Sequence, residues 1–265
     1  MSTRPPKTLM STPVAADALS FYVLTTASFL ESHVATYVDN LEGLYADDQP
    51  TRQWLRDTWL PEEAEHGKVL GEYVRKMWPS FDWQRAFDAF SSRYLPVCSP
   101  ALLRPTPGLE ALARCVTETA ATMTYRCMAE YTDDAELRAL MRRLSSDEIR
   151  HYRYFRRLHL GCNGRERIGF ARRARTVLGR SELVRDEDLA MAYEPINASW
   201  TVPPPFALWT YEEFRRASAA VVKAHLPLRE AKRMMFSPLK SDSWLARLAL
   251  STLGVLVTRY YLPKA

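Results

Sequence analysis

The chain has little glycine, only 9 residues in 265, and this scarcity disfavours a β architecture with glycine-rich turns. Cysteine is also scarce, and no pair of cysteines has the C-x-x-C spacing of a thiolate metal site. Isolated cysteines of this kind are typical of free thiols in a reducing compartment. They are Cys98, Cys115, Cys127 and Cys162. We therefore expect a cytoplasmic, helix-rich protein without a disulfide framework.

Long apolar runs are missing as well. Residues 1–13 are polar and carry no apolar stretch, so the sequence predicts no signal peptide. The most apolar late stretch, residues 244–262, is interrupted by Arg247 and Arg259. This interruption favours a buried terminal helix over a transmembrane segment. The hydrophobic content of 47% is nevertheless enough for a sizeable core in a soluble protein.

Positive charge is concentrated in one part of the chain. Residues 138–185 contain 14 arginines, no lysine and four acidic residues, a local net charge of +10 in a chain whose total is +5. This arginine block is either a solvated helix face or a docking surface for an acidic partner. Partners of suitable charge are an acyl or peptidyl carrier protein, the phosphates of coenzyme A, or a reduced ferredoxin. Nucleic acid is disfavoured because no recognisable binding motif accompanies the block.

Apolar residues recur at helical spacing in four long segments. Pro61 lies inside the second segment and predicts a kink or a local widening just before Glu62. Gly161 is expected to end the fourth, and a proline-rich crossover with a short helix at about 82–91 joins the two pairs. Two helical pairs joined in this way are the plan of a ferritin-like four-helix bundle. The predicted helices span about 14–44, 51–77, 107–131 and 134–160.

The predicted domain organisation follows from these segments. Residues 1–13 form an N-terminal extension, and residues 14–160 form the bundle. Residues 161–265 form a C-terminal extension of three or four further helices around the prolines at 203–205, packed on the bundle. The expected fold class is therefore all-α.

Two Glu-x-x-His motifs carry the candidate chemistry: Glu63 with His66, and Glu148 with His151. Residues at i and i+3 share one helix face, so each motif can present a carboxylate and an imidazole to one metal site. Each motif also has an upstream glutamate on an apolar stripe. These glutamates are Glu31, 32 residues before Glu63, and Glu118, 30 residues before Glu148.

Four glutamates and two histidines in this order match the donor set of di-iron carboxylate bundles. Burying four carboxylates without cations would be prohibitive, and two ferrous ions would balance their charge. Oxygen and imidazole donors suit iron or manganese, and the lack of cysteine donors argues against a thiolate site. The sequence thus predicts a site that holds two iron ions.

The motifs also resemble a known family, the soluble acyl-carrier-protein desaturases. Segment 54–59 reads Trp-Leu-Arg-Asp-Thr-Trp, segment 62–67 reads Glu-Glu-Ala-Glu-His-Gly, and segment 147–151 reads Asp-Glu-Ile-Arg-His. The family shows Glu-Glu-x-x-His-Gly on one helix and Asp-Glu-x-Arg-His on another. The resemblance covers about residues 20–160.

The resemblance implies a role for each residue of the site. Glu31 and Glu118 would each bind one iron, Glu63 and Glu148 would bridge both, and His66 and His151 would cap one each. Glu62 and Asp147 would orient the opposite histidines, as metal-bound imidazoles require. The family has a threonine three residues after the glutamate of its third helix, near where oxygen binds. This chain has Ala121 there and Thr122 one position later, so Thr122 becomes the candidate catalytic hydroxyl.

Two further features near the predicted site have alternative interpretations. Small residues surround the metal glutamates and indicate either close helix packing or a substrate cavity. Tyr125 lies seven residues after Glu118 on the same face, and is either a core tyrosine or a redox or proton-donating residue. The small residues are Ala27, Ser28, Ala35, Ala120, Ala121 and Thr122.

Two functions are compatible with the sequence. The first is a di-iron oxidase that activates dioxygen for desaturation or hydroxylation (a desaturase or monooxygenase) of an organic substrate, such as an acyl or aminoacyl group on a carrier. Its electrons would come from an external donor such as reduced ferredoxin, because the chain shows no flavin, nicotinamide or iron–sulfur motif. The second is a ferritin-like ferroxidase or peroxide scavenger, which would leave the hundred C-terminal residues unexplained. A homodimer is compatible with either function.

Overall fold

The computed structural model describes residues 13–239, except the side chains of residues 182–189. The prediction of an all-α protein is confirmed: the described chain forms helices, and its β pairing is a single antiparallel bridge between Phe81 and Trp200. None of these helices is long and apolar enough to cross a membrane. The predicted helix within residues 244–262 lies outside the described residues. The helices are α1 (Ala18–Glu31), α2 (Val34–Leu44), α3 (Gln49–Trp54), α4 (Leu60–Met77), α5 (Trp83–Tyr94), α6 (Pro107–Tyr131), α7 (Ala135–Glu166), α8 (Phe170–Asn197), α9 (Tyr211–His225) and α10 (Leu228–Phe236), with short 3₁₀ turns at Val14–Ala16, Pro100–Leu102 and Ser237–Leu239.

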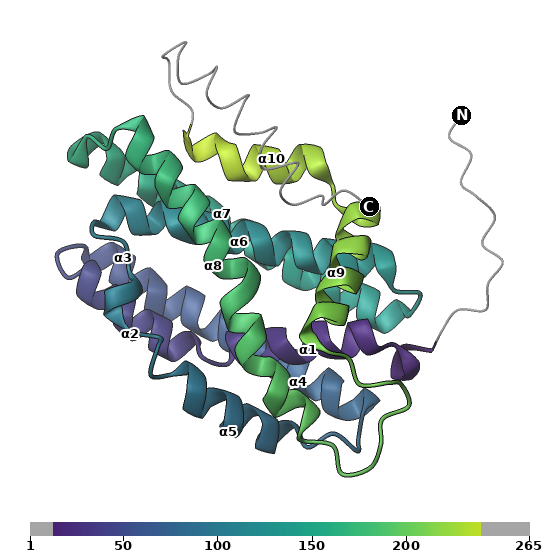
Figure 1. Cartoon of the computed structure of the whole chain (residues 1–265). Helices are drawn as coiled ribbons and strands as arrows, with labels where there is room; N and C mark the ends of the chain where they lie inside the picture. The colour runs from purple at the N-terminus through teal and green to yellow at the C-terminus, as the bar shows by residue number, and fades with distance from the viewer. Residues whose placement is uncertain (1–12, 240–265) are drawn as a thin grey trace, which may run out of the picture.

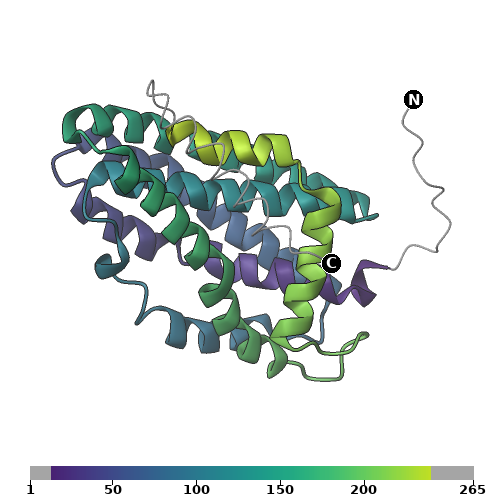
Figure 2. The same ribbon diagram turned by 45° about the horizontal axis from the view of Figure 1, so that its top comes forward.

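Helices α1, α4, α6 and α7 pack together as two pairs, α1 with α4 and α6 with α7 (Figure 1). Helix α8 crosses from the end of α7 to α5, and α10 lies along α6 (Figures 1 and 2). Helix α9 also contacts α6 and α1. The helices beyond residue 161 therefore cover one side of the two pairs.

The first predicted helix, 14–44, is wrong in one respect, because the chain breaks it at Ser32 and His33. The Ser32 hydroxyl donates to the carbonyl of Ser28, and the His33 N–H donates to the carbonyl of Leu30. Helix α4 also approaches very closely here, since a Cβ at Gly67 would lie 2.6 Å from Ser32 Oγ. The break therefore coincides with a very close approach of α4 to the end of α1.

The predicted widening before Glu62 is a π-helical turn, Leu55–Trp59, between α3 and α4. Pro61 lies at the start of α4. Proline has no N–H to donate, and its ring crowds the carbonyl of the preceding turn. A wider turn relieves that clash and lets one helical path continue toward Glu63.

The predicted end of the fourth helix at Gly161 is wrong, because α7 continues to Glu166 and ends at Arg167 with φ 50°. Tertiary contacts outweigh the local preference of glycine. The Glu166 carboxylate accepts hydrogen bonds from Gly108 N at 2.8 Å and from the Thr106 hydroxyl. This carboxylate caps the start of α6, so the last turns of α7 are held in place.

Two hydrophobic clusters fill the interior, and the candidate glutamates lie between them. Helices α6 and α7 contribute to both clusters, whereas α1 and α4 contribute buried residues to the first, and α2 and the π-helical turn next to them contribute to the second. One cluster contains Phe29, Leu70, Tyr125 and Leu144, and the other contains Val34, Trp59, Cys115 and Tyr152. The four carboxylates therefore share one layer across the middle of the packed helices.

Candidate metal centre

The structure brings all six predicted ligands together. They lie on α1, α4, α6 and α7, the four helices that the sequence analysis assigned to them. Glu31 is the last residue of α1 and is partly exposed, whereas the other five side chains are buried. The five buried residues are Glu63, His66, Glu118, Glu148 and His151.

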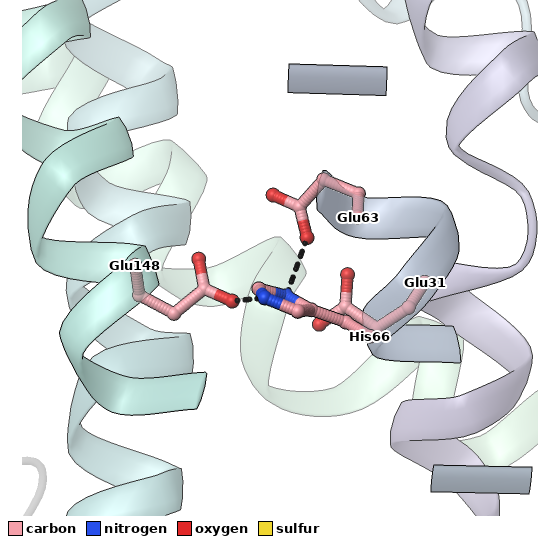
Figure 3. Close-up of side chains that lie close together, drawn as sticks. All are labelled: Glu31, Glu63, His66 and Glu148. Carbon is pink, nitrogen blue, oxygen red and sulfur yellow. Dashed lines mark hydrogen bonds and ion pairs between the residues drawn. The ribbon is translucent and has the colours of Figure 1, made fainter. Parts of the chain in front are cut away.

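The ligand atoms form two overlapping groups. Within each group they lie within 4.8 Å of one another, and Glu63 and Glu148 belong to both groups. In Figure 3, Glu63 and Glu148 approach His66 from two helices, with Glu31 beside it. Two shared carboxylates with one imidazole on each side are the geometry of a two-metal site with carboxylate bridges. The groups are Glu31, Glu63, His66 and Glu148, and Glu63, Glu118, Glu148 and His151.

His66 uses its two ring nitrogens for different partners. Its Nδ1 lies 3.1 Å from Oε2 of Glu63 and 3.2 Å from Oε1 of Glu148. Its Nε2 lies 3.2 Å from Oδ2 of Asp147, which comes from α7. The ring therefore faces the carboxylates on one side and is oriented by Asp147 on the other.

His151 repeats this arrangement from the opposite pair of helices. Its Nδ1 lies 3.1 Å from Oε1 of Glu63, and its Nε2 lies 2.7 Å from Oε2 of Glu62. Arg150 joins the two orienting carboxylates, since it pairs with Asp147 and contacts Oε2 of Glu62 at 3.1 Å. Carboxylates that hold the outer nitrogen of a histidine set its tautomer and ring direction.

The histidines are strongly basic in this environment. Burial by itself would lower the pKa of His66, but hydrogen bonds and charges from Glu148 and Glu63 outweigh it and raise that pKa to about 11. Burial likewise opposes the same carboxylates at His151, and they raise its pKa to about 12. Both imidazoles therefore hold a proton at neutral pH in the metal-free protein.

The outer carboxylates are weak acids. Burial, followed by repulsion from Glu63 and Glu148, raises the pKa of Glu31 and of Glu118 well above the ordinary value. Burial also acts to raise the pKa of Glu63, but the two histidines lower it well below its usual range. In the metal-free protein, bound protons thus reduce the repulsion among the carboxylates. Two bound cations would do the same in the loaded site.

The donor set fits two divalent cations. Oε1 of Glu148 is fully buried and faces Nδ1 of His66 at 3.2 Å in the metal-free protein. Once that imidazole loses its proton to become a metal ligand, this buried oxygen would need another partner, and a cation would supply it. The oxygen and imidazole donors suit iron or manganese.

Thr122 lies in a different environment from the one expected of a catalytic hydroxyl. Its side chain is fully buried, and its hydroxyl donates to the carbonyl of Glu118 at 2.6 Å. This bond is the common back-bonding of threonine within a helix. Thr122 does not line the cavity beside the cluster, whereas Ala121 does.

Tyr125 contacts the cluster directly. Its phenol donates a 2.6 Å hydrogen bond to Oε1 of Glu31, and its side chain lines the cavity. Burial, and then the charges of Glu31 and Glu148, raise the pKa of Tyr125 well above its ordinary value. The sequence placed Tyr125 on the face of Glu118, but it could not show that the hydroxyl reaches Glu31 on another helix.

The other small residues near the site divide into two groups. Ala27, Ala120 and Ala121 line the cavity. Ser28 accepts a 2.8 Å hydrogen bond from the indole of Trp83, and Ala35 is exposed, so neither opens space beside the metal. Both interpretations of the small residues therefore apply, at different positions.

A large cavity adjoins the cluster, with a volume of about 1080 Å³. It is lined mainly by apolar side chains of α1, α6, α9 and α10, and it also includes Glu31, Glu63, Glu118 and Glu148. Typical small-molecule pockets have volumes of roughly 300–1,000 Å³. An organic molecule in this cavity would contact the predicted ligands.

The arginine block is not a single surface. Arg142, Arg153 and Arg157 are exposed on α7. Arg156 instead donates to Ser237 Oγ at 3.0 Å, and the buried Arg173 donates to the carbonyl of Pro238. Part of the block therefore holds the segment after α10, and the exposed part remains available for a partner.

Comparisons with protein-family models and with curated proteins give no match to this chain. The assignment of function therefore depends on the residues and the geometry described above.

Proposed function

We propose that the chain is a ferritin-like di-iron oxidase that uses dioxygen to desaturate or hydroxylate an organic substrate. The observation that carries this proposal is the pair of overlapping ligand groups that share Glu63 and Glu148 beside a large apolar cavity. The order of the donors along α1, α4, α6 and α7 supports the ferritin-like assignment. When bound, two ferrous ions would supply the electrons that reduce dioxygen and the oxidising power to remove hydrogen from a C–H bond.

The residues of this chain would hold and insulate that chemistry. Glu62 and Asp147 fix the directions of His151 and His66, and the two hydrophobic clusters exclude water above and below the carboxylate layer. Tyr125 is the hydroxyl that can hold or move a proton at Oε1 of Glu31. A substrate in the cavity would lie beside the Glu31 carboxylate.

The remaining electrons would come from an external one-electron donor such as a reduced ferredoxin. The exposed side chains of Arg142, Arg153 and Arg157 provide a positive surface on α7 that suits an acidic protein. An acyl or peptidyl carrier protein is an alternative partner of the same charge. The proposed function is also compatible with a homodimer.

A ferroxidase or peroxide scavenger is the alternative function, and the same six residues support it. The cavity favours the oxidase, because oxidation of ferrous iron needs no apolar space of about 1080 Å³ beside the metal. Helices α8, α9 and α10 contribute to that cavity. The oxidase therefore gives a role to the C-terminal helices that a ferroxidase would leave without one.

The test begins with metal content. We expect two metal ions per chain in the wild type, and loss of most of the metal in Glu63→Ala and in Glu148→Ala, because each change removes a shared carboxylate. Glu65→Ala is the matched control, since Glu65 lies on the same helix but is exposed and pairs with Lys68. Normal metal content in the two bridge variants, or one ion or none in the wild type, would contradict the two-metal proposal.

The second stage separates oxidase from ferroxidase. The loaded protein is given a reductant, oxygen and a panel of free and carrier-bound substrates, and oxygen uptake and product are measured together. An oxidase couples oxygen uptake to an organic product. Rapid oxidation of excess ferrous iron without product from any substrate would instead favour the ferroxidase.

A further inference from the structure

The lining of the cavity has an unusual distribution of charge. Its only carboxylates, among the residues that the structure describes, are the four of the candidate metal centre. Its cationic residues come from α6, α8, α9 and α10. They are Arg114, Arg180, Arg215 and Lys232. Because two divalent cations would neutralise all four carboxylates, the rest of the lining would then attract an anion.

Arg114 is the one buried residue among these four cations of the lining. Its residue is 8% exposed, and it lines the cavity. Its Nε donates to Oε1 of Glu110 at 3.0 Å, while the guanidinium carbon lies 5.8 Å and 5.9 Å from the ring centroids of Tyr37 and Trp59. Its two terminal nitrogens donate to no acceptor among the described residues. A buried guanidinium with unused donors is suited to a planar, bidentate acceptor such as a carboxylate.

Trp59 provides a second, independent observation at the same place. This residue is 3% exposed and lines the cavity, and its indole N–H has no hydrogen-bond acceptor within residues 13–239. Buried donors are almost always paired, so each exception calls for an acceptor from outside the chain. The terminal nitrogens of Arg114 and the indole N–H of Trp59 therefore both lack an acceptor among the described residues.

The position of Arg114 on α6 shows how far it lies from the predicted metal ligand Glu118. Arg114 is the first residue of α6 that lines the cavity and Met128 the last, a span of about 21 Å at 1.5 Å per residue. Glu118 follows Arg114 by one helical turn, roughly 6 Å along the axis. Beyond Glu118 the lining is mainly apolar, with Leu19, Val23 and Met128 among its residues, although Thr119, Thr124 and Arg215 also line it. The buried guanidinium of Arg114 thus lies near the metal carboxylates, with mainly apolar lining beyond them.

We infer that the substrate is a free amphiphilic acid, whose carboxylate is bound by Arg114 beside Trp59 and whose apolar chain extends along α6 past Glu118. The inference that this acid is the substrate rests on the proposed oxidase function. The inference that the acid binds at Arg114 does not. A thioester on a carrier protein would present a neutral carbonyl at this position. The site therefore favours a free acid over a carrier-bound acyl group.

The experiment compares dodecanoate with dodecan-1-ol, which has the same chain without the charge. Calorimetric titration uses the full chain loaded with Zn²⁺, so that no redox chemistry interferes. We expect dodecanoate to bind at least about 10-fold more tightly, as a charged hydrogen bond allows. Arg114→Gln should bring the two affinities to within about 2-fold, and Glu110 keeps its contacts with Arg180 and with the N–H of Arg104 in that variant.

Two further variants make the test specific. Trp59→Phe keeps an aromatic ring but removes the indole N–H and part of the ring system. It should therefore weaken dodecanoate several-fold more than it weakens dodecan-1-ol, which reports the loss of packing alone. It also carries the test if Arg114→Gln fails to fold. Lys232→Gln removes a charge elsewhere in the same cavity and should preserve the preference for the acid.

Equal affinity for acid and alcohol in the wild type, a preference that survives Arg114→Gln, or no binding of either would overturn the inference. Metal content measured on the same samples separates it from the proposed function. Two metal ions per chain without acid binding would leave the metal centre intact and remove the acid site. Acid binding by a protein that holds no metal would support the acid site and contradict the proposed metal centre.

Discussion

The phenol of Tyr125 on α6 donates a 2.6 Å hydrogen bond to Oε1 of Glu31 on α1, across 94 positions of the sequence. Glu31 is the partly exposed member of the cluster and lies at the cavity, as Tyr125 does. The bond therefore connects one predicted metal ligand to the space where a substrate would lie. It also fixes which oxygen of Glu31 faces Tyr125.

Tyr125→Phe removes this bond and keeps the ring. We expect the variant to bind two metal ions, because Tyr125 is not a ligand, with a free energy of unfolding lower by about 1 kcal/mol. In the oxidase, less product should form per oxygen consumed, since the proton at Glu31 loses its partner. Metal analysis, chemical unfolding and oxygen-to-product ratios check this. Tyr73→Phe is the control, because its hydroxyl contacts Asp134, the N-cap of α7, and not a predicted metal ligand. An unchanged oxygen-to-product ratio in Tyr125→Phe would leave Tyr125 with a packing role only.

Metal binding should release protons. The raised pKa values of His66 (about 11) and His151 (about 12) mean that both imidazoles are protonated at neutral pH in the metal-free protein, and the raised pKa values of Glu31 and Glu118 favour the protonated carboxyls. Metal ligation requires neutral imidazoles and ionised carboxylates. Because the protons are bound only in the metal-free state, raising the pH favours the bound state and apparent metal affinity increases. Calorimetry in buffers of different ionisation enthalpy should show a proton release approaching one from each histidine, with any release from Glu31 and Glu118 in addition. Metal binding without proton release would contradict this account.

Thr122→Val should have little effect on oxygen chemistry, contrary to the role that its position in the sequence suggested. Its hydroxyl is bonded to the Glu118 carbonyl and does not line the cavity, so the loss of this bond should cost at most about 1 kcal/mol of stability. Ala121→Leu is the informative comparison, because it places bulk in the cavity beside Glu118. It should reduce product while metal content stays normal. Uncoupled oxygen consumption in Thr122→Val would restore the hydroxyl to the mechanism.

Reversing charge at Arg153 and Arg157 should weaken turnover that depends on an acidic protein donor. Both side chains are exposed on α7. Their attraction to acidic groups of a partner protein would be screened by salt over roughly 8–10 Å at physiological ionic strength. Added salt should therefore produce the same loss in the wild type. Arg85→Glu on α5 is the control, because it is exposed on a different helix. Turnover with a small chemical reductant should not change in any of these proteins. If protein-driven turnover is insensitive to both salt and charge reversal, α7 is not the docking face.

The meeting of the six predicted ligands followed from local rules. An i, i+3 pair on a helix needs only helical geometry to present Glu63 and His66 to one point, and the repeated pattern supplied Glu148 and His151. The break after Glu31 and the continuation of α7 past Gly161 did not follow, because contacts with Gly67 and with the start of α6 decide them. Those contacts join segments that are far apart in the chain.

The cavity was equally hard to read from sequence. Arg114 counts only as one more charged residue on α6 until the rings of Tyr37 and Trp59 are seen to enclose it. The contrast between Ala121, which lines the cavity, and Thr122, which does not, depends on one residue of helical rotation. Composition and spacing constrain which side chains share a helix face, whereas the space between helices depends on how α8, α9 and α10 pack.

The position of Glu31 at the end of α1 makes the two halves of the site unequal. The group around His151 is built from four buried residues within continuous helices, while the group around His66 includes a ligand followed at once by a helix break. The backbone on one side of Glu31 therefore leaves the α-helix, and we expect its carboxylate to change how many oxygens it offers more readily than that of Glu118, which lies within α6. On this reasoning the ion nearer His151 would enter first and stay, and the ion nearer His66 would be the exchangeable one.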